Sequence, residues 1–101
     1  MIKSSEETEL SNLFKALGDA SRRRIIDELM IRDKQSLFEI CSRVSAVHGI
    51  SSSRQALSRH LAVLESAGII TIEWKGTTKL HTLNKSRLSS LSSGWLSTFG
   101  D

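Results

Sequence analysis

The chain has 101 residues, of which 39% are hydrophobic and 25% charged, with a formal net charge of +3 and one cysteine. This length supplies one modest core, so we expect a single domain over residues 1–101. The chain has no apolar run near the ~18 residues of a membrane span and no apolar secretion segment, so we expect a cytoplasmic protein without a membrane partner. One cysteine excludes an intrachain disulfide.

Two amphipathic helices are predicted first. A helix over about residues 6–17 follows from apolar residues at i, i+3, i+4 and i+7, namely Leu10, Leu13, Phe14 and Leu17. Gly18 ends this helix, and Asp19 caps a second one, whose apolar face contains Ile25, Ile26, Leu29 and Met30. The first turn of the second helix carries three arginines that point in three directions, Arg22, Arg23 and Arg24. They have two interpretations, salt bridges on a solvated surface or a contact with phosphate.

The middle of the chain predicts a helix-turn-helix. Ser36 and Glu39 form a capping box that begins a third helix. The apolar face of this helix contains Leu37, Ile40, Cys41 and Val44. After a short connection with a glycine, Ser52 and Gln55 form a second capping box, which begins a fourth helix over about residues 53–67. Two helices joined by such a tight turn are typical of a helix-turn-helix.

The fourth helix has a polar face suited to DNA. Its buried face is predicted to contain Leu57, Leu61 and Leu64, which leaves Arg54, Gln55, Ser58, Arg59 and Ala62 exposed. Arginine can pair with guanine and glutamine with adenine in the major groove. Carboxylates, which would repel phosphate, are absent from this helix until Glu65. The pattern therefore predicts a DNA-reading helix.

A β-hairpin and a last helix complete the predicted fold. Ile70, Ile72 and Trp74 alternate on one face of a first strand, and we expect Leu80 of the second strand to lie opposite them. The tip, Lys75-Gly76-Thr77-Thr78-Lys79, places lysines that could contact the sugar-phosphate backbone. Asn84 is expected to cap a last helix over about residues 85–99, with an apolar face of Leu88, Leu91, Trp95, Leu96 and Phe99. This face has two interpretations, a partner surface or packing against the first helix of the same chain.

Charge is distributed unevenly between the two parts of the chain. Residues 1–40 carry seven Lys or Arg and eight Asp or Glu, a net charge of −1. Residues 41–101 carry seven Lys or Arg and three Asp or Glu, a net charge of +4. The basic second part favours an anionic partner such as double-stranded DNA.

Three stretches in this order resemble the ArsR-type family of dimeric winged-helix transcriptional repressors. They are FKALGDASRRRIIDEL, SRQALSRHLAVLESAGII and KGTTKLH. The resemblance extends from about Leu13 to Phe99. It implies a mainly α (α+β) winged helix-turn-helix fold, with five helices and a two-stranded hairpin wing in the order ααααββα.

The resemblance also implies partners and site residues. The chain would form a homodimer through its first and last helices, with an interface of Leu10, Leu13, Leu91, Trp95 and Phe99. The two fourth helices would enter successive major grooves of a near-palindromic operator. The expected DNA-binding residues are Ser53, Arg54, Gln55, Ser58 and Arg59 on this helix and Lys75, Thr77 and Lys79 on the wing. His60 matches the family's S-x-H-L histidine but borders the buried face, so we expect it to make a structural hydrogen bond.

The chain departs from the family's metal sensors. Their third helix carries a C-x-C pair, whereas here the same stretch has only Cys41, and the last helix has no histidine or carboxylate. We therefore expect no metal site and no cofactor; a metal held across the dimer by His81 or His48 is the alternative. An effector, if one exists, is not readable from the sequence.

Two other functions compete with the repressor hypothesis. The apolar last helix also fits a winged-helix protein-interaction module, and Cys41 allows a thiol redox-responsive regulator. A reactive thiol needs exposure and a lowered pKa, but Cys41 lies on an apolar face. Catalytic motifs are absent, so we do not expect an enzyme.

Overall fold

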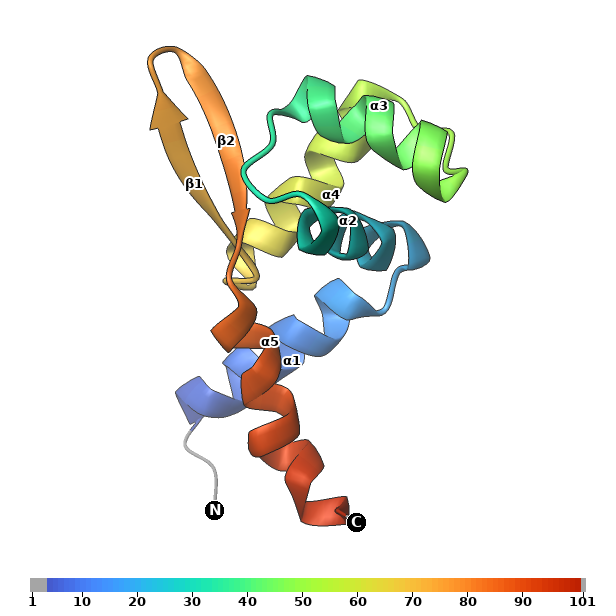
Figure 1. Ribbon diagram of the computed structural model, residues 1–101. Helices are drawn as coiled ribbons and strands as arrows, with labels where there is room; N and C mark the ends of the chain where they lie inside the picture. The colour runs from blue at the N-terminus through green and yellow to red at the C-terminus, as the bar shows by residue number, and fades with distance from the viewer. Residues whose placement is uncertain (1–3, 101) are drawn as a thin grey trace.

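The computed structural model describes residues 4–100. Its elements are α1 (Ser4–Leu17), α2 (Ala20–Ile31), α3 (Leu37–His48), α4 (Arg54–Ser66), β1 (Ile70–Lys75), β2 (Thr78–Leu83), α5 (Lys85–Ser93) and a short 3-10 helix, η1 (Trp95–Phe99). Figure 1 shows α2, α3 and α4 packed together, the hairpin projecting from them, and α1 and α5 at the opposite end with both chain termini. The predicted mainly α fold with a two-stranded antiparallel hairpin is confirmed.

The core lies between α1, α2, α3, α4 and the base of the hairpin, and α5 adds Leu91 to it. It contains Leu13, Ala16, Ile25, Ile26, Leu29, Ile40, Val44, Leu57, Leu61, Leu64, Ala67, Ile69, Ile70, Leu83 and Leu91. The predicted apolar faces of the first four helices are therefore largely confirmed. Met30 is the exception on α2, because it lies in the last turn and its side chain is 55% exposed. The fully buried residue two positions earlier is charged, Glu28.

The capping predictions have mixed outcomes. Ser36 and Glu39 form the predicted capping box, with Ser36 Oγ accepting from the Glu39 amide at 3.2 Å and Glu39 Oε1 accepting from the Ser36 amide at 3.1 Å. The second capping box is wrong by one residue, because Ser53 caps α4 by accepting from the Ala56 amide. Asn84 occupies the predicted cap position of α5, but its side chain makes no capping hydrogen bond and donates to the Gly68 carbonyl at 3.0 Å.

The hairpin register corrects one predicted contact. Directly paired residues of an antiparallel hairpin share a face, and Leu80 pairs with Glu73 rather than with a residue of the apolar face. Trp74 pairs with Lys79 and Ile72 with His81. Only the base of the apolar face reaches the core, so Trp74 stays 63% exposed near the tip.

The single last helix predicted over about residues 85–99 is interrupted at Gly94. A Cβ atom at position 94 would lie 2.6 Å from the Ser90 carbonyl oxygen, so only glycine fits this close approach. Serine hydroxyls of α5 also bond to carbonyls one turn earlier, for example Ser90 Oγ to the Arg87 carbonyl at 2.6 Å. Such bonds weaken a helix, and the final segment continues as the 3-10 helix η1.

A buried carboxylate joins α2 to α3 and to the hairpin. Glu28 is fully buried and accepts hydrogen bonds from Arg43 Nε and, at 2.6 Å, from Gln35 Nε2. His48 Nε2 lies 3.2 Å from its other oxygen. The Gln35 backbone forms a β-bridge with His81 of β2. Burial acts to raise the pKa of Glu28, but the hydrogen bonds from Arg43, Gln35 and His48 outweigh it, and the pKa lies below its ordinary value.

We expect Arg43→Ala to lower the free energy of unfolding by about 2 kcal/mol, because it leaves a buried carboxylate short of a charged donor. Urea denaturation at pH 7 measures this loss. Arg24→Ala is the matched control, because it removes an exposed ion pair with Asp27 and should cost less than about 1 kcal/mol. The excess loss should be complete above pH 4.5, the ordinary pKa of glutamate, and should disappear as the pH falls through the lowered pKa of Glu28, because the protonated carboxyl no longer needs a charged donor. Equal losses for the two variants would contradict this role of Glu28.

Candidate nucleic-acid interface

The exposed face of α4 is set by the burial of its other face. Leu57, Leu61 and Leu64 are at most 4% exposed, and α4 packs against α1, α2, α3 and β1. The predicted reading residues are all exposed on the opposite side: Arg54, Gln55, Ser58, Arg59 and Ala62. Within residues 4–100, the side chains of Gln55, Ser58 and Arg59 make no hydrogen bond or ion pair. They are therefore available to a partner.

The N-terminus of α4 is held by α3 and by its own cap. Gly49, which ends α3, has a φ of 68°, a left-handed conformation that glycine adopts without strain. Ser53, which the sequence predicts as a DNA contact, uses its hydroxyl to accept from the Ala56 amide at 3.1 Å. The Arg54 guanidinium lies over the ring of Phe38, 5.4 Å from the ring centroid. The sequence reasoning missed Phe38; its signal was an apolar residue beside, rather than on, the buried face of α3.

The wing presents its basic residues to solvent, and one of them, Lys79, lies near α4. Gly76 has a φ of 62° and forms the tip with Thr77, between Lys75 and Thr78. Lys75, Thr77 and Lys79 are all exposed, as a DNA contact requires. A hollow of about 280 Å³ lies between α4 and the wing, with Ser58 of α4 and Lys79 of β2 among its lining residues. The exposed face of α4 and the wing therefore lie on the same side of the molecule.

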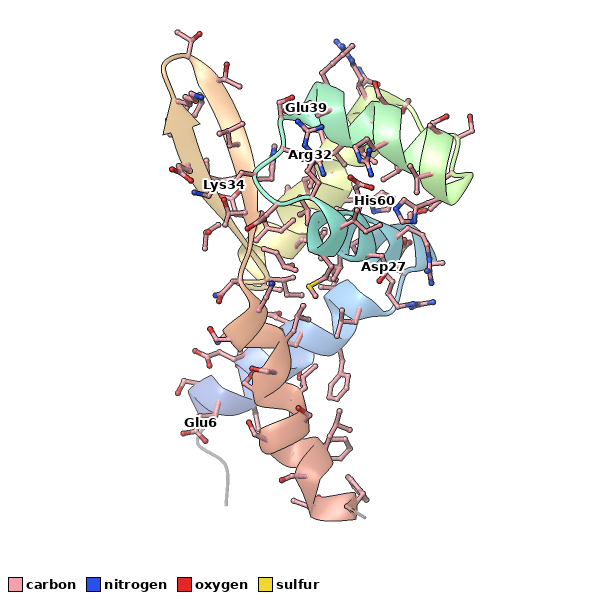
Figure 2. All side chains as sticks on the ribbon, in the orientation of Figure 1. Glu6, Asp27, Arg32, Lys34, Glu39 and His60 are labelled. Atoms are coloured by element: carbon pink, nitrogen blue, oxygen red, sulfur yellow. The ribbon has the colours of Figure 1, made fainter. Side chains whose placement is uncertain are left out.

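The base of the wing is tied to the loop between α2 and α3. Lys34, labelled in Figure 2, forms an ion pair with Glu73 of β1, with 3.4 Å between Nζ and Oε2. His81 donates its backbone amide to the Gln35 carbonyl at 2.8 Å. Burial lowers the pKa of the His81 side chain, and the nearby Lys79 acts in the same direction against the hydrogen bond to Gln35. His81 therefore favours its neutral form at pH 7, and Lys79 carries the positive charge of β2.

The three arginines of α2 have separate contacts. Arg22 donates to two carbonyls at the end of α1 and to His60 of α4. Arg23 donates to the Leu17 carbonyl, and Arg24 forms an ion pair with Asp27. His60, labelled in Figure 2, lies where α4 passes the start of α2 and makes the structural hydrogen bond expected of it.

The residues predicted for the dimer interface divide into two groups. Leu13 and Leu91 belong to the core of the chain itself, at 4% and 7% exposure, so most of each side chain is already covered within one chain. Their place in a dimer interface stays a prediction. Leu10 is half-buried, whereas Trp95 is 44% and Phe99 70% exposed. Trp95 packs edge-to-face against Phe14 of α1 and against Phe99. The exposed apolar surface at this end also includes Phe14 and Leu96, which the prediction did not contain.

The single thiol and the possible metal ligands are dispersed. Cys41 is partly buried and packs against the core. His48 binds the buried Glu28, and His81 bonds to Gln35. Across residues 4–100, no three His, Cys, Asp or Glu side chains are grouped as a metal ion would need. In the same residues, no helix combines the length and the apolar character needed to cross a membrane.

Comparisons with known proteins agree with this geometry. Residues 17–73 match a family model described as a helix-turn-helix domain. An HTH-type transcriptional regulator of Bacillus subtilis, YuzN, is 42% identical over 84 residues, which cover 83% of this chain and 91% of that protein. An ArsR-like transcriptional regulator from Rhodococcus sp. RHA1 superposes with a TM-score of 0.80 at 26% identity, covering 98% of this chain and 84% of that one. The homodimeric winged helix-turn-helix domain of Mb0332 from Mycobacterium bovis superposes with a TM-score of 0.70 at 19% identity, covering 98% and 88%.

The fold and the exposed basic face of α4 define a winged helix-turn-helix DNA-binding protein. The matching family model and relative identify an HTH-type transcriptional regulator, and with the ArsR-like neighbour at 26% identity they define the family: the chain belongs to the ArsR-type winged helix-turn-helix transcriptional regulators. The family suggested by the sequence motifs is confirmed, and it is a family of transcriptional regulators rather than of enzymes.

Ser53 allows helix capping to be separated from DNA binding. We expect Ser53→Ala to lower the free energy of unfolding by about 1 kcal/mol, because the first turn of α4 loses its cap. Ser53→Asp should keep the stability, since aspartate caps equally well, yet weaken DNA binding, because it places a carboxylate beside phosphate. Thermal denaturation and fluorescence anisotropy with a labelled duplex measure the two effects. Unchanged DNA affinity in Ser53→Asp would contradict the prediction that the start of α4 lies close to the DNA backbone.

Proposed function

We propose that the protein is a homodimeric repressor that binds a near-palindromic operator. The observation that carries the proposal is the face of α4 formed by Arg54, Gln55, Ser58 and Arg59. It is exposed, it carries two guanidiniums, and its side chains are of the kinds that pair with base edges in the major groove. The first carboxylate of α4, Glu65, lies two turns beyond Ser58. Lys75, Thr77 and Lys79 of the wing would hold the sugar-phosphate backbone.

Dimerisation is supported by the opposite end of the chain. Phe14, Trp95, Leu96 and Phe99 expose between 41% and 70% of their surface there, and exposed apolar clusters commonly mark protein interfaces. The Mb0332 domain, with the same fold, is homodimeric. A two-fold dimer presents two copies of α4, and a two-fold arrangement of reading helices matches a near-palindromic site.

Substitution of the two reading arginines should change sequence discrimination. Duplexes selected by the wild-type protein from a random library provide a specific probe, and a scrambled duplex of equal composition provides the reference. We expect Arg54→Ala and Arg59→Ala each to weaken binding to the selected duplex by about tenfold or more, and to the scrambled duplex by less, if the arginines pair with bases. Fluorescence anisotropy at several salt concentrations measures both affinities.

Substitutions of the wing lysines distinguish contacts with the DNA backbone from contacts with bases. Lys75→Ala and Lys79→Ala should weaken binding to both duplexes alike and reduce the salt dependence by about one counterion each. Lys85→Ala is the charge-matched control, because this exposed lysine starts α5, where Asn84 and Arg87 bond to the residues after the C-terminal end of α4 and not to the residues predicted to bind DNA. Equal losses on both duplexes for Arg54→Ala and Arg59→Ala would reassign these arginines to the backbone. A folded dimer that binds no duplex at low salt would favour the protein-interaction module instead.

The oligomeric state tests the second part of the proposal. We expect Phe99→Glu to shift the dimer toward monomer, because it places a charge in an apolar interface without a partner. Sedimentation equilibrium measures the dissociation constant. Ile31→Glu is the matched control, since this residue is 62% exposed but lies at the end of α2. A dimer that tolerates Phe99→Glu as well as Ile31→Glu would place the interface elsewhere.

A further inference from the structure

One side chain of α2 contacts both the end of α1 and the middle of the reading helix. Arg22 Nε donates to the Ala16 carbonyl at 2.7 Å, and Arg22 Nη2 donates to the Lys15 carbonyl at 3.0 Å. The remaining nitrogen, Nη1, lies 3.3 Å from Nδ1 of His60 on α4. Each nitrogen of the guanidinium therefore has its own partner.

The backbone on both sides of this arginine is also fixed. The Arg22 amide donates to the side chain of Asp19, the cap of α2, at 3.1 Å. This hydrogen bond lowers the pKa of Asp19 below its ordinary value, because the ionised carboxylate is the better acceptor. The Lys15 carbonyl also accepts from the Gly18 amide, at 3.4 Å, and Arg22 adds a shorter hydrogen bond to it and one to the Ala16 carbonyl. These hydrogen bonds fix the start of α2 against the end of α1, and the guanidinium of Arg22 extends from there to α4.

His60 lies next to the residues of α4 that we propose to contact bases. It follows Arg59 directly, and Ser58 lies two positions before it. It is partly buried, at the border between the core face of α4 and the exposed face. A hydrogen bond at this border resists rotation of α4 about its own axis. The apolar contacts of Leu57, Leu61 and Leu64 resist such a rotation less strongly, because they have no direction.

We propose that Arg22 is a positioning residue for DNA reading, which sets the rotation of α4 relative to α1 through its hydrogen bond to His60. The proposal rests on the proposed function, since it concerns the same reading face. Because a guanidinium is a planar fork, it can serve three acceptors at fixed angles, which the single ammonium of lysine cannot. Arg22 itself does not contact the DNA in this scheme.

Arg22→Lys is the principal test, because it retains the positive charge. We expect the ratio of affinities for the selected and scrambled duplexes to fall by about tenfold, as for the loss of a hydrogen bond with a charged donor. Arg23→Lys is the matched control: Arg23 also donates to a carbonyl at the end of α1, that of Leu17 at 2.5 Å, but within residues 4–100 it makes no hydrogen bond or ion pair with α4. Its affinity ratio should stay within twofold of that of the wild type.

Substitutions of His60 provide a rescue that a purely structural role would not show. His60→Asn keeps an acceptor close to the position of Nδ1, whereas His60→Leu removes it. We expect His60→Asn to keep most of the affinity ratio and His60→Leu to lose it by about as much as Arg22→Lys. In the double variant Arg22→Lys, His60→Leu, the two losses should not add, because both changes break the same bond.

Hydrogen exchange of the DNA-free protein tests the positioning of α4 by Arg22 separately from DNA binding. Amides of α4 should exchange faster in Arg22→Lys than in the wild type and Arg23→Lys, while those of β1 and β2 should not. If the wild type does not discriminate between the duplexes but α4 exchanges faster, the proposed function fails and the positioning contact stands. If Arg22→Lys keeps both the wild-type affinity ratio and the wild-type exchange of α4, the inference is overturned.

Discussion

Burial of one face of α4 is the constraint on which the rest of the structure depends. Leu57, Leu61 and Leu64 are enclosed by α1, α2, α3 and the first strand, and they leave α4 only one side free. This burial is non-directional and supplies most of the stability of such a small domain. It also decides which polar side chains can meet a partner, so the same interaction that forms the core defines the reading face.

Directional contacts add what apolar packing cannot. Glu28 is hydrogen-bonded to three side chains of α3 and of the loop before it, and these bonds fix the position of α3 relative to α2. Arg22 does the same between α1 and α4. Both contacts concern the relation between helices rather than their existence. A winged helix that recognises DNA sequence needs fixed helix orientations, because hydrogen bonds between side chains and base edges tolerate little displacement.

The two ends of the molecule have different physical characters. The α4 face and the wing are exposed and basic, whereas Phe14, Trp95, Leu96 and Phe99 form an apolar cluster at the opposite end. The core between them connects the two through α1, which contributes Leu13 and Ala16 to it and contacts α4 directly.

Local pattern was enough to predict much of this protein. Apolar periodicity determined four helices and the buried face of α4, and subtraction then identified Arg54, Gln55, Ser58 and Arg59 as exposed. The capping box at Ser36 and Glu39 and the turn at Gly76 were readable because they depend on neighbours in the chain. Contacts between distant segments were not readable. The hairpin register that pairs Leu80 with Glu73, the burial of Leu13 and Leu91, and the contacts of Glu28 and Arg22 all depend on how elements pack. A sequence shows which face of a helix is apolar, but only the tertiary structure decides what covers that face and which polar side chain is enclosed with it.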